Sequence, residues 1–175
     1  GLSRRGRCHT FDARADGFAR TESVVAMAVV RVPDAVSLAR LLGNAVRSDG
    51  RSASFTAPNG RAQQLLLRGA QATAGAATAL AHLEAHGTGT LLGDPTEVAA
   101  VASVHLGDAS AAALAVRSHK AATGHAEPAA GLLGLLAVVA ASARAGAPPN
   151  AQLRVANPYV LAATTTSGRR AALST

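Results

Sequence analysis

Two histidines lie in similar surroundings, each in a glycine-containing turn between an expected strand and an expected helix. His86 is followed by Gly-Thr-Gly-Thr, and His125 is preceded by Gly124 and by Lys120 five residues upstream. Strand ends that face helix starts are where α/β folds usually place ligands. Two imidazoles that meet in one pocket can donate hydrogen bonds to a developing oxyanion or transfer a proton. Such a pair suits decarboxylation and carbon–carbon bond formation at a thioester.

Other interpretations of these residues are weaker. A single histidine at a strand end is more often a packed, hydrogen-bonded residue than a catalyst. His82 and His86 have the i,i+4 spacing of zinc ligands on a helix, but the H-E-x-x-H order is absent and the segment reads as a strand. The glycines of residues 87–93 resemble a dinucleotide loop, but the third comes one residue late. Three further histidines lack comparable surroundings, and we interpret them as surface or structural residues: His9, His105 and His119.

The elements that must position the two turns alternate between strand-like and helix-like segments, which predicts an α/β layered fold. Residues 23–32 are rich in Val and predict a buried strand. Residues 34–42 predict an amphipathic helix with Asp34 as its N-cap. Residues 44–59 hold turn signals and predict a loop, and a helix begins near Gly60.

The second part of the chain carries the histidine turns. Residues 78–85 predict a strand that leads to His86. The clearest helix start is Asp94-Pro95-Thr96-Glu97, with an acid at the N-cap, Pro at N1 and Glu at N3, as in a capping box. Residues 111–116 predict another buried strand, which leads to the turn with His125, and a long apolar helix follows from about Pro128.

Composition limits the class of protein. Apolar residues make up 49% of the 175 residues and aromatic residues only 2%, so the core must be aliphatic. The net charge is +7, but the arginines are mostly scattered singly and form no basic stripe, which argues against nucleic-acid binding. A single cysteine excludes a disulfide scaffold and a cysteine-rich zinc module. Lys120 is the one lysine among 17 basic residues. This favours a position where arginine does not fit over a surface lysine kept by chance.

No targeting segment is apparent, because the basic residues 1–7 are not followed by an apolar stretch. The longest apolar run, residues 129–143, is too short to span a bilayer and predicts a buried helix. Pro148 and Pro149 end that helix and begin an extended tail. We therefore expect a soluble, cytoplasmic protein that binds neither membranes nor nucleic acid. The chain begins without Met and stops without a closing element, so we also expect a fragment.

Four segments carry a family resemblance. EAHGTGTLLGDPTE (residues 84–97) resembles the first histidine motif of β-ketoacyl synthases, especially the ketosynthase domains of polyketide synthases, and KAATGHAEPAAG (residues 120–131) resembles their second. GRCHTFDARADGFARTE (residues 6–22) resembles the stretch that follows their nucleophile region. AVRSDGRSASFTAPNGRAQ (residues 45–63) resembles their N-x-D-G…T-A-P-N-G segment. The likenesses occur in the expected order over nearly the whole chain.

The resemblance implies an incomplete thiolase-like fold, layered α-β-α-β-α, with the end of the first half and most of the second. Residues 1–34 would be the tail of the ketosynthase N-terminal half. Residues 35–175 would be the C-terminal half, truncated before its last glycine-rich strand. It also implies decarboxylative Claisen condensation of an acyl thioester with a malonyl-type thioester, in polyketide or fatty-acid biosynthesis.

The resemblance assigns the catalytic site to His86, His125, Lys120 and Glu97. The two histidines would line the site where a malonyl thioester decarboxylates, and Lys120 with Glu97 would tune them. No cofactor would be bound by this chain, because the substrates arrive on the phosphopantetheine of an acyl carrier protein. The complete protein would be a homodimer. The nucleophilic cysteine would lie upstream, because Cys8 has the wrong neighbours, so this fragment alone should be inactive.

Some positions depart from the family pattern, and they keep other functions open. The departures are Thr21, Ser23, Arg117, Ala121 and Ala122. One alternative is a non-catalytic ketosynthase-like partner that shapes a dimer or a chain-length tunnel. Another is an α/β binding module without thioester chemistry.

Overall fold

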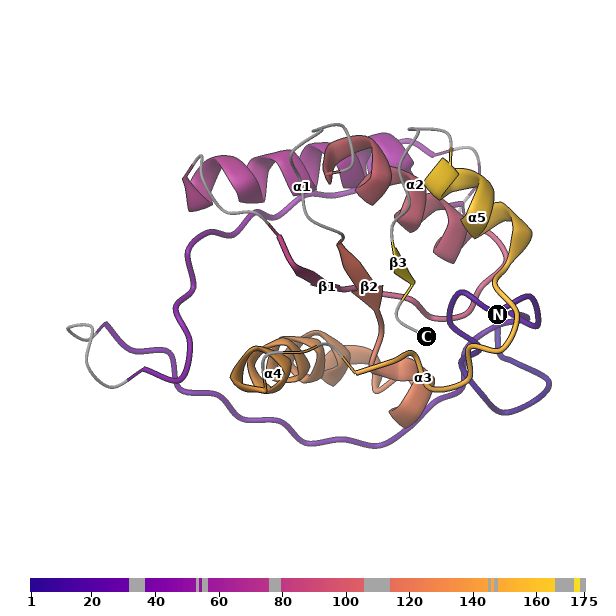
Figure 1. The fold of residues 1–175 in the computed structure, drawn as a ribbon, viewed down its shortest axis with the longest axis horizontal. Coiled ribbons are helices and arrows are strands. Elements are labelled where there is room, and N and C mark those ends of the chain that lie inside the picture. Colours follow the sequence, from indigo (N-terminus) through magenta and orange to yellow (C-terminus); the bar gives the residue numbers. More distant parts are fainter. Residues whose placement is uncertain are drawn as a thin grey trace.

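The fold is known from a computed structural model, which describes residues 1–31, 37–52, 54, 57–75, 80–105, 114–144, 146, 148–165 and 172–173. Three short parallel strands form its centre in these residues (Figure 1). β1 (His82–Glu84) pairs with β2 (Ala115–Arg117), which pairs with β3 (Ala172–Leu173). The register places the last residues of β1 and β2, Glu84 and Arg117, opposite each other. Parallel pairing needs long crossover connections, and the chain uses helices for them.

Helices cover both faces of the sheet (Figure 1). α1 (Gly60–Ala74), α2 (Gly93–His105) and α5 (Pro158–Thr165) lie on one face. α3 (Lys120–Thr123) and α4 (Ala130–Ala143) lie on the other, and the 3-10 turn η1 (Glu127–Ala129) leads into α4. α2 packs against α1 and α5, and α4 packs against β1. The layered α/β arrangement expected from the alternating sequence pattern is therefore present.

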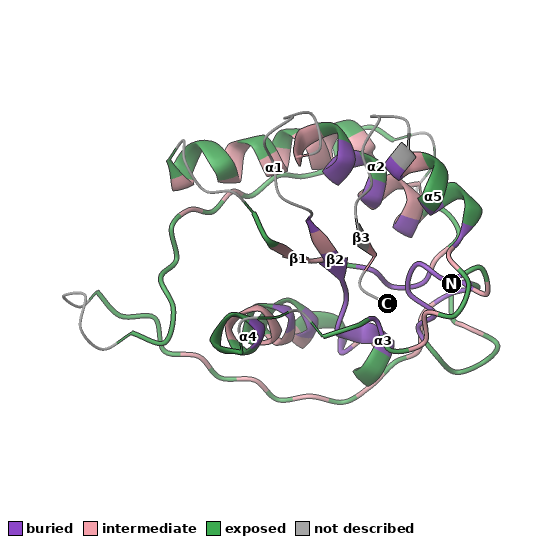
Figure 2. Ribbon diagram, in the orientation of Figure 1, coloured by how far each residue is buried: buried purple, intermediate pink, exposed green. Residues whose placement is uncertain are grey.

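The core lies between α2 and the sheet and is aliphatic apart from one ring. Val98 and Val101 of α2 cluster with Val116 of β2, and Val160 of α5 joins them. Phe11, which is fully buried, comes to this cluster from the irregular N-terminal segment. The buried parts of the ribbon lie along α2, in the N-terminal loops and from β2 into α3 (Figure 2).

The N-terminal segment, residues 1–22, has no helix or strand but is tied to the rest of the chain. Isolated β-bridges join Asp12 to Ala156 and Arg20 to His125. The Asp12 carboxylate accepts hydrogen bonds from the backbone N–H groups of Arg154 and Val155, at 2.7 and 3.1 Å. These contacts hold the segment beside the turn that carries His125.

Two expected elements are not formed. Residues 23–31, expected as a buried strand, run without regular structure, and Val24, Val29 and Val30 are exposed. Residues 37–42, from the expected helix, are also irregular, and Leu38 is 96% exposed. Val32, which ends the expected strand, and residues 34–36, which begin the expected helix with Asp34 as its cap, lie outside the described residues. A strand is stable only beside a pairing strand, and no described strand pairs with residues 23–31.

Three other expected elements are present with different boundaries. A helix begins at Gly60, where the Asn59 side chain accepts a hydrogen bond from the Ala62 N–H at 3.1 Å. The strands expected over residues 78–85 and 111–116 are shorter, and 78–79 and 111–113 fall outside the described residues. The expected extended tail instead contains α5 and β3.

The apolar run of residues 129–143 forms η1 and α4 but is not a fully buried helix. Ala130, Gly134 and Ala141 are buried, whereas Leu132, Leu135 and Leu136 are about two-fifths exposed at 41%, 39% and 39%. Only one side of α4 therefore packs within this chain. No helix in the described ranges is both long and apolar enough to cross a membrane.

Candidate active site

The two turn histidines lie side by side. The rings of His86 and His125 meet edge to face, with centroids 5.3 Å apart and an interplanar angle of 87°. Phe18, from the N-terminal segment, makes a second edge contact with His125, also at 5.3 Å. The structure therefore brings together the two histidines that the sequence predicts to be neighbours. His125 is also held by Phe18 of the N-terminal segment.

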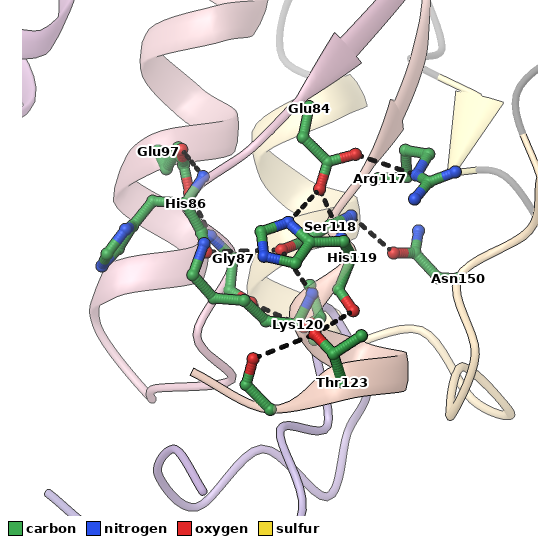
Figure 3. A network of polar contacts seen from close by, with 12 residues as sticks. Glu84, His86, Gly87, Glu97, Arg117, Ser118, His119, Lys120, Thr123 and Asn150 are labelled. Atoms are coloured by element: carbon green, nitrogen blue, oxygen red, sulfur yellow. Dashed lines mark hydrogen bonds and ion pairs between the residues drawn. The ribbon is translucent and has the colours of Figure 1, made fainter. Parts of the chain in front are cut away.

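The adjacent strand ends deliver both turns. Ala85, directly after β1, donates a backbone hydrogen bond to the Arg117 carbonyl at 2.7 Å. Ser118, directly after β2, places its hydroxyl 3.4 Å from the His86 carbonyl oxygen (Figure 3). The Asn150 side chain accepts from the Ser118 N–H at 2.9 Å and donates to the Val116 carbonyl at 3.2 Å, so it fixes the end of β2.

Gly87 permits the close approach of the two turns. Its φ of +44° lies in the left-handed region, where a side chain is strained. A Cβ atom at Gly87 would lie 2.6 Å from the Ser118 Cβ and 2.8 Å from the Thr10 Cγ2. Neither distance is possible without movement of the neighbouring segment. Glycine is therefore required for His86 to sit beside the turn after β2.

Two carboxylates near the start of α2, Asp94 in its first turn and Glu97 after it, hold the His86 loop. The Glu97 oxygens accept the N–H groups of His86 and Gly87 at 2.6 and 2.9 Å. The Asp94 oxygens accept those of Phe11 and Gly89 at 2.8 and 3.0 Å. The capping-box prediction is therefore wrong. The helix α2 begins at Gly93, and Asp94 and Glu97 accept hydrogen bonds from loops outside α2 and not from its first turn. Burial raises the pKa of Asp94 to about 6.

Lys120 is almost completely buried, at 3% exposure. Burial lowers the pKa of its ammonium, while the charge of Glu97 acts in the opposite direction. Burial raises the pKa of Glu97, and the hydrogen bonds from Gly87 and His86 oppose that shift. No hydrogen bond joins Lys120 to Glu97 among the described contacts, and both Glu97 oxygens accept backbone N–H groups. The two residues interact through their charges instead.

The electrostatic surroundings favour the neutral form of both histidines. Burial, followed by the charge of Lys120, lowers the pKa of His86. Burial also lowers the pKa of His125, and the nearby His86 and Lys120 lower it further. A neutral imidazole can donate one hydrogen bond and accept another. The pair is therefore suited to stabilising an oxyanion or accepting a proton near neutral pH.

Residues 38–154 match the family described as "Beta-ketoacyl synthase, C-terminal domain". The chain belongs to the β-ketoacyl synthase family. It is 42% identical over 166 residues to a phenolphthiocerol/phthiocerol polyketide synthase protein of Mycobacterium tuberculosis, covering 91% of this chain and 9% of that protein. A second protein of the same synthase and organism is 42% identical over 172 residues, covering 94% of this chain and 11% of that protein.

Solved ketosynthase domains share the fold. The oxazolomycin ketosynthase domain from Streptomyces albus JA3453 aligns with a TM-score of 0.77 at 31% identity, over 91% of this chain and 29% of that one. The ketosynthase from module 6 of the bacillaene synthase of Bacillus subtilis 168 aligns with a TM-score of 0.78 at 27% identity, over 90% and 30%. This ketosynthase segment therefore has a partial thiolase-like fold. It spans about a tenth of the synthases and under a third of the solved domains. The boundary at residues 34/35 stays a prediction.

Sequence reasoning missed a buried charged group in this ketosynthase segment. Glu84, Arg117 and His119 have side chains that are 5%, 9% and 7% exposed. The Glu84 carboxylate contacts the Arg117 Nε and the His119 Nδ1, each at 2.9 Å (Figure 3). His119 is thus structural and not a surface residue, and Arg117 is more than a departure from the family motif. The sequence signal that could have revealed the group is the position of Glu84 and Arg117 at the ends of two strands expected to be neighbours.

Cys8 is also placed as a structural residue. Its side chain is buried, and its sulfur accepts a hydrogen bond from the Ala19 N–H at 3.2 Å. Burial raises the pKa of the thiol, which disfavours the thiolate that a nucleophile needs. A cavity of about 140 Å³ borders Cys8 and Lys120. In the described ranges, no three His, Cys, Asp or Glu side chains gather as they would around a metal ion.

Proposed function

We propose that this chain is the histidine-bearing part of a ketosynthase that performs decarboxylative Claisen condensation in polyketide biosynthesis. The contact between His86 and His125, beside the buried Lys120, carries the proposal. Membership of the β-ketoacyl synthase family supports the condensation reaction. The similarity to polyketide synthases supports polyketide biosynthesis as the pathway. The catalytic residues are His86, His125 and Lys120, with Glu97 as the residue that positions the His86 loop.

The reaction begins with an acyl group on a cysteine elsewhere in the ketosynthase. A malonyl thioester then loses CO₂: the bond between the carboxylate and Cα breaks, and its electron pair forms an enolate. The enolate oxygen accepts hydrogen bonds from His86 and His125. The enolate Cα attacks the acyl carbonyl, a carbon–carbon bond forms, and the cysteine leaves as the thiolate. Lys120 supplies positive charge beside the pair, which favours the developing negative charge.

Substrates and partners follow from the same proposal. The acyl and malonyl groups arrive as thioesters on the phosphopantetheine of an acyl carrier protein, and this chain binds no cofactor of its own. The complete ketosynthase acts as a homodimer in the cytoplasm. The fragment alone, without the nucleophile, is inactive.

The test uses the full-length protein that contains this segment. It is incubated with an acyl thioester and then with malonyl carrier protein, while intact mass follows acyl loading and a second assay follows CO₂ release. We expect one acyl group per ketosynthase and CO₂ release that depends on loading, with Cys8→Ala loading as well as the wild type. Acylation of Cys8 would contradict the assignment of the nucleophile. Absence of loading would favour a non-catalytic partner role.

A further inference from the structure

Glu84 is held from two directions by residues that follow one another on the neighbouring strand and turn. Arg117, its partner in the β1–β2 register, places its Nε 2.9 Å from one carboxylate oxygen. His119 approaches the other oxygen with its ring Nδ1 at 2.9 Å and also donates its backbone N–H to that oxygen. One buried carboxylate therefore fixes both ends of the turn from Arg117 to His119.

The protonation of the group follows from its contacts. An ionised carboxylate only accepts hydrogen bonds, so the His119 Nδ1 must carry a proton. The His119 Nε2 is buried without a hydrogen-bond partner among the described atoms, which a lone pair tolerates better than an N–H. The Nδ1–H is therefore the one hydrogen bond that the His119 ring makes in the described contacts.

The same turn leads directly to the catalytic lysine. His119 occupies the N-cap position of α3, but its side chain makes no capping bond and is directed to Glu84 instead. Its carbonyl accepts the Ala122 and Thr123 N–H groups at 2.9 and 3.0 Å, so His119 begins the helix whose first residue is Lys120. The Lys120 N–H lies 3.3 Å from the Ser118 hydroxyl, which contacts the His86 carbonyl.

The helix α4 covers the Glu84 and His119 side chains. A Cβ atom at Gly134 would lie 3.4 Å from the Glu84 Cγ and 3.6 Å from the His119 Cε1. The ring of His119 is therefore enclosed between the strand ends and α4, where water cannot replace its hydrogen bond. Loss of the Nδ1–H would leave the Glu84 carboxylate underbonded in a buried place, and the turn would have to move to compensate.

We propose that His119 is a positioning residue of the condensation reaction, which places Lys120 beside His86 by holding Glu84 with its ring N–H. The inference rests on the proposed ketosynthase function. It concerns a residue that differs in role from the catalytic pair, because His119 acts on the lysine through the turn and does not contact the reacting atoms.

The test compares two variants in the full-length protein. His119→Leu removes the donor and keeps an apolar side chain in the space. His119→Asn retains an N–H at the position of Nδ1. We expect His119→Leu to slow malonyl decarboxylation by about tenfold or more, since small misplacements of catalytic groups have effects of that size, and acyl loading to be unchanged. His119→Asn should recover most of the decarboxylation rate.

Controls separate positioning from a general loss of structure. His105→Leu, at the end of α2, removes a histidine whose ring bonds only Gln71 in the described contacts, and it should leave both half-reactions unchanged. If His119→Leu does not fold, Glu84→Met removes the acceptor of the same hydrogen bond and should slow decarboxylation without affecting loading.

Three results would overturn the inference while the wild type remains active. They are an unchanged decarboxylation rate in folded His119→Leu, an unchanged rate in folded Glu84→Met, and an Asn variant as slow as the Leu variant. An inactive wild type would instead overturn the proposed function, so the two failures are distinguishable.

Discussion

His86 and His125 contact each other edge to face, with ring centroids 5.3 Å apart, because they follow two strands that pair in parallel. The turn after β1 carries the first histidine, and the second follows the short helix α3 after β2. Each turn is then fixed by a carboxylate: Glu97 holds the His86 loop, and Glu84 holds the start of α3. The geometry of the histidine pair thus depends on residues other than the histidines themselves.

The charge of Lys120 should control the pH dependence of decarboxylation. Because Lys120 lowers the pKa of His86 and His125, Lys120→Met should raise both values. In the proposed mechanism the neutral rings are the active form, so activity should fall as pH decreases through these pKa values, and higher values should move that fall to higher pH. Lys120→Met should also slow the reaction near neutral pH by about 10²-fold.

Lys120→Arg is the matched variant. It keeps the charge, so the acid side of the pH–rate profile should stay in place, but its planar guanidinium does not fit the buried site and the rate should fall. Rates measured from acidic to neutral pH on both variants check the prediction. An acid side that does not move in Lys120→Met, or a fully active Lys120→Arg, would contradict it.

The Glu97 carboxylate should be needed for a stable His86 loop. Glu97→Gln replaces one acceptor oxygen by an amide donor, which then faces the N–H of His86 or Gly87. We expect a loss of about 1–3 kcal/mol in the free energy of unfolding, together with slower decarboxylation. Denaturant unfolding and CO₂ release measure the two effects.

Glu127→Gln is the control for that loss. It removes an exposed ion pair with Arg20, whose side chain is 64% exposed, and such pairs contribute less than about 1 kcal/mol. Equal destabilisation by Glu97→Gln and Glu127→Gln would show that Glu97 has no special part in holding the loop.

Gly87→Ala should disrupt the site through its backbone. The strain of φ +44° and the contacts with Ser118 and Thr10 together should cost roughly 3 kcal/mol. Gly146→Ala is the control, because a Cβ there would contact nothing within 4 Å. Thermal unfolding should show a clearly lower midpoint for Gly87→Ala alone. Equal midpoints for the two variants would mean that the turns do not pack as closely as described.

Much of the site could be predicted because its signals are local. Asp94-Pro95 indicates a helix start, and glycines beside His86 and His125 indicate turns after strands. The destinations of the buried side chains could not be predicted. Glu97 has the position of a capping residue but binds the His86 loop through two backbone N–H groups. Glu84 meets Arg117 through strand register, which motif spacing does not reveal.

The failed fold predictions have a common physical cause. Residues 23–31 contain enough Val for a strand, and residues 37–42 enough Leu for an apolar helix face, yet both runs are largely exposed. Apolar patterning predicts a stable element only when another layer covers it, and no described element does so here. α5 was missed for the opposite reason, because Val160 reaches the core from a short helix that follows two prolines and a loop.

Release of CO₂ from malonyl carrier protein by the acyl-loaded, full-length protein tests the central claim most directly. Wild type, His86→Ala, His125→Ala and the double variant are compared after loading has been confirmed by intact mass. We predict that each single variant loads normally but releases CO₂ about 10²–10⁴-fold more slowly, and that the double variant is little slower than either single one because the pair acts as a unit. A wild-type rate of CO₂ release in either single variant would contradict the assignment of this histidine pair to the chemistry.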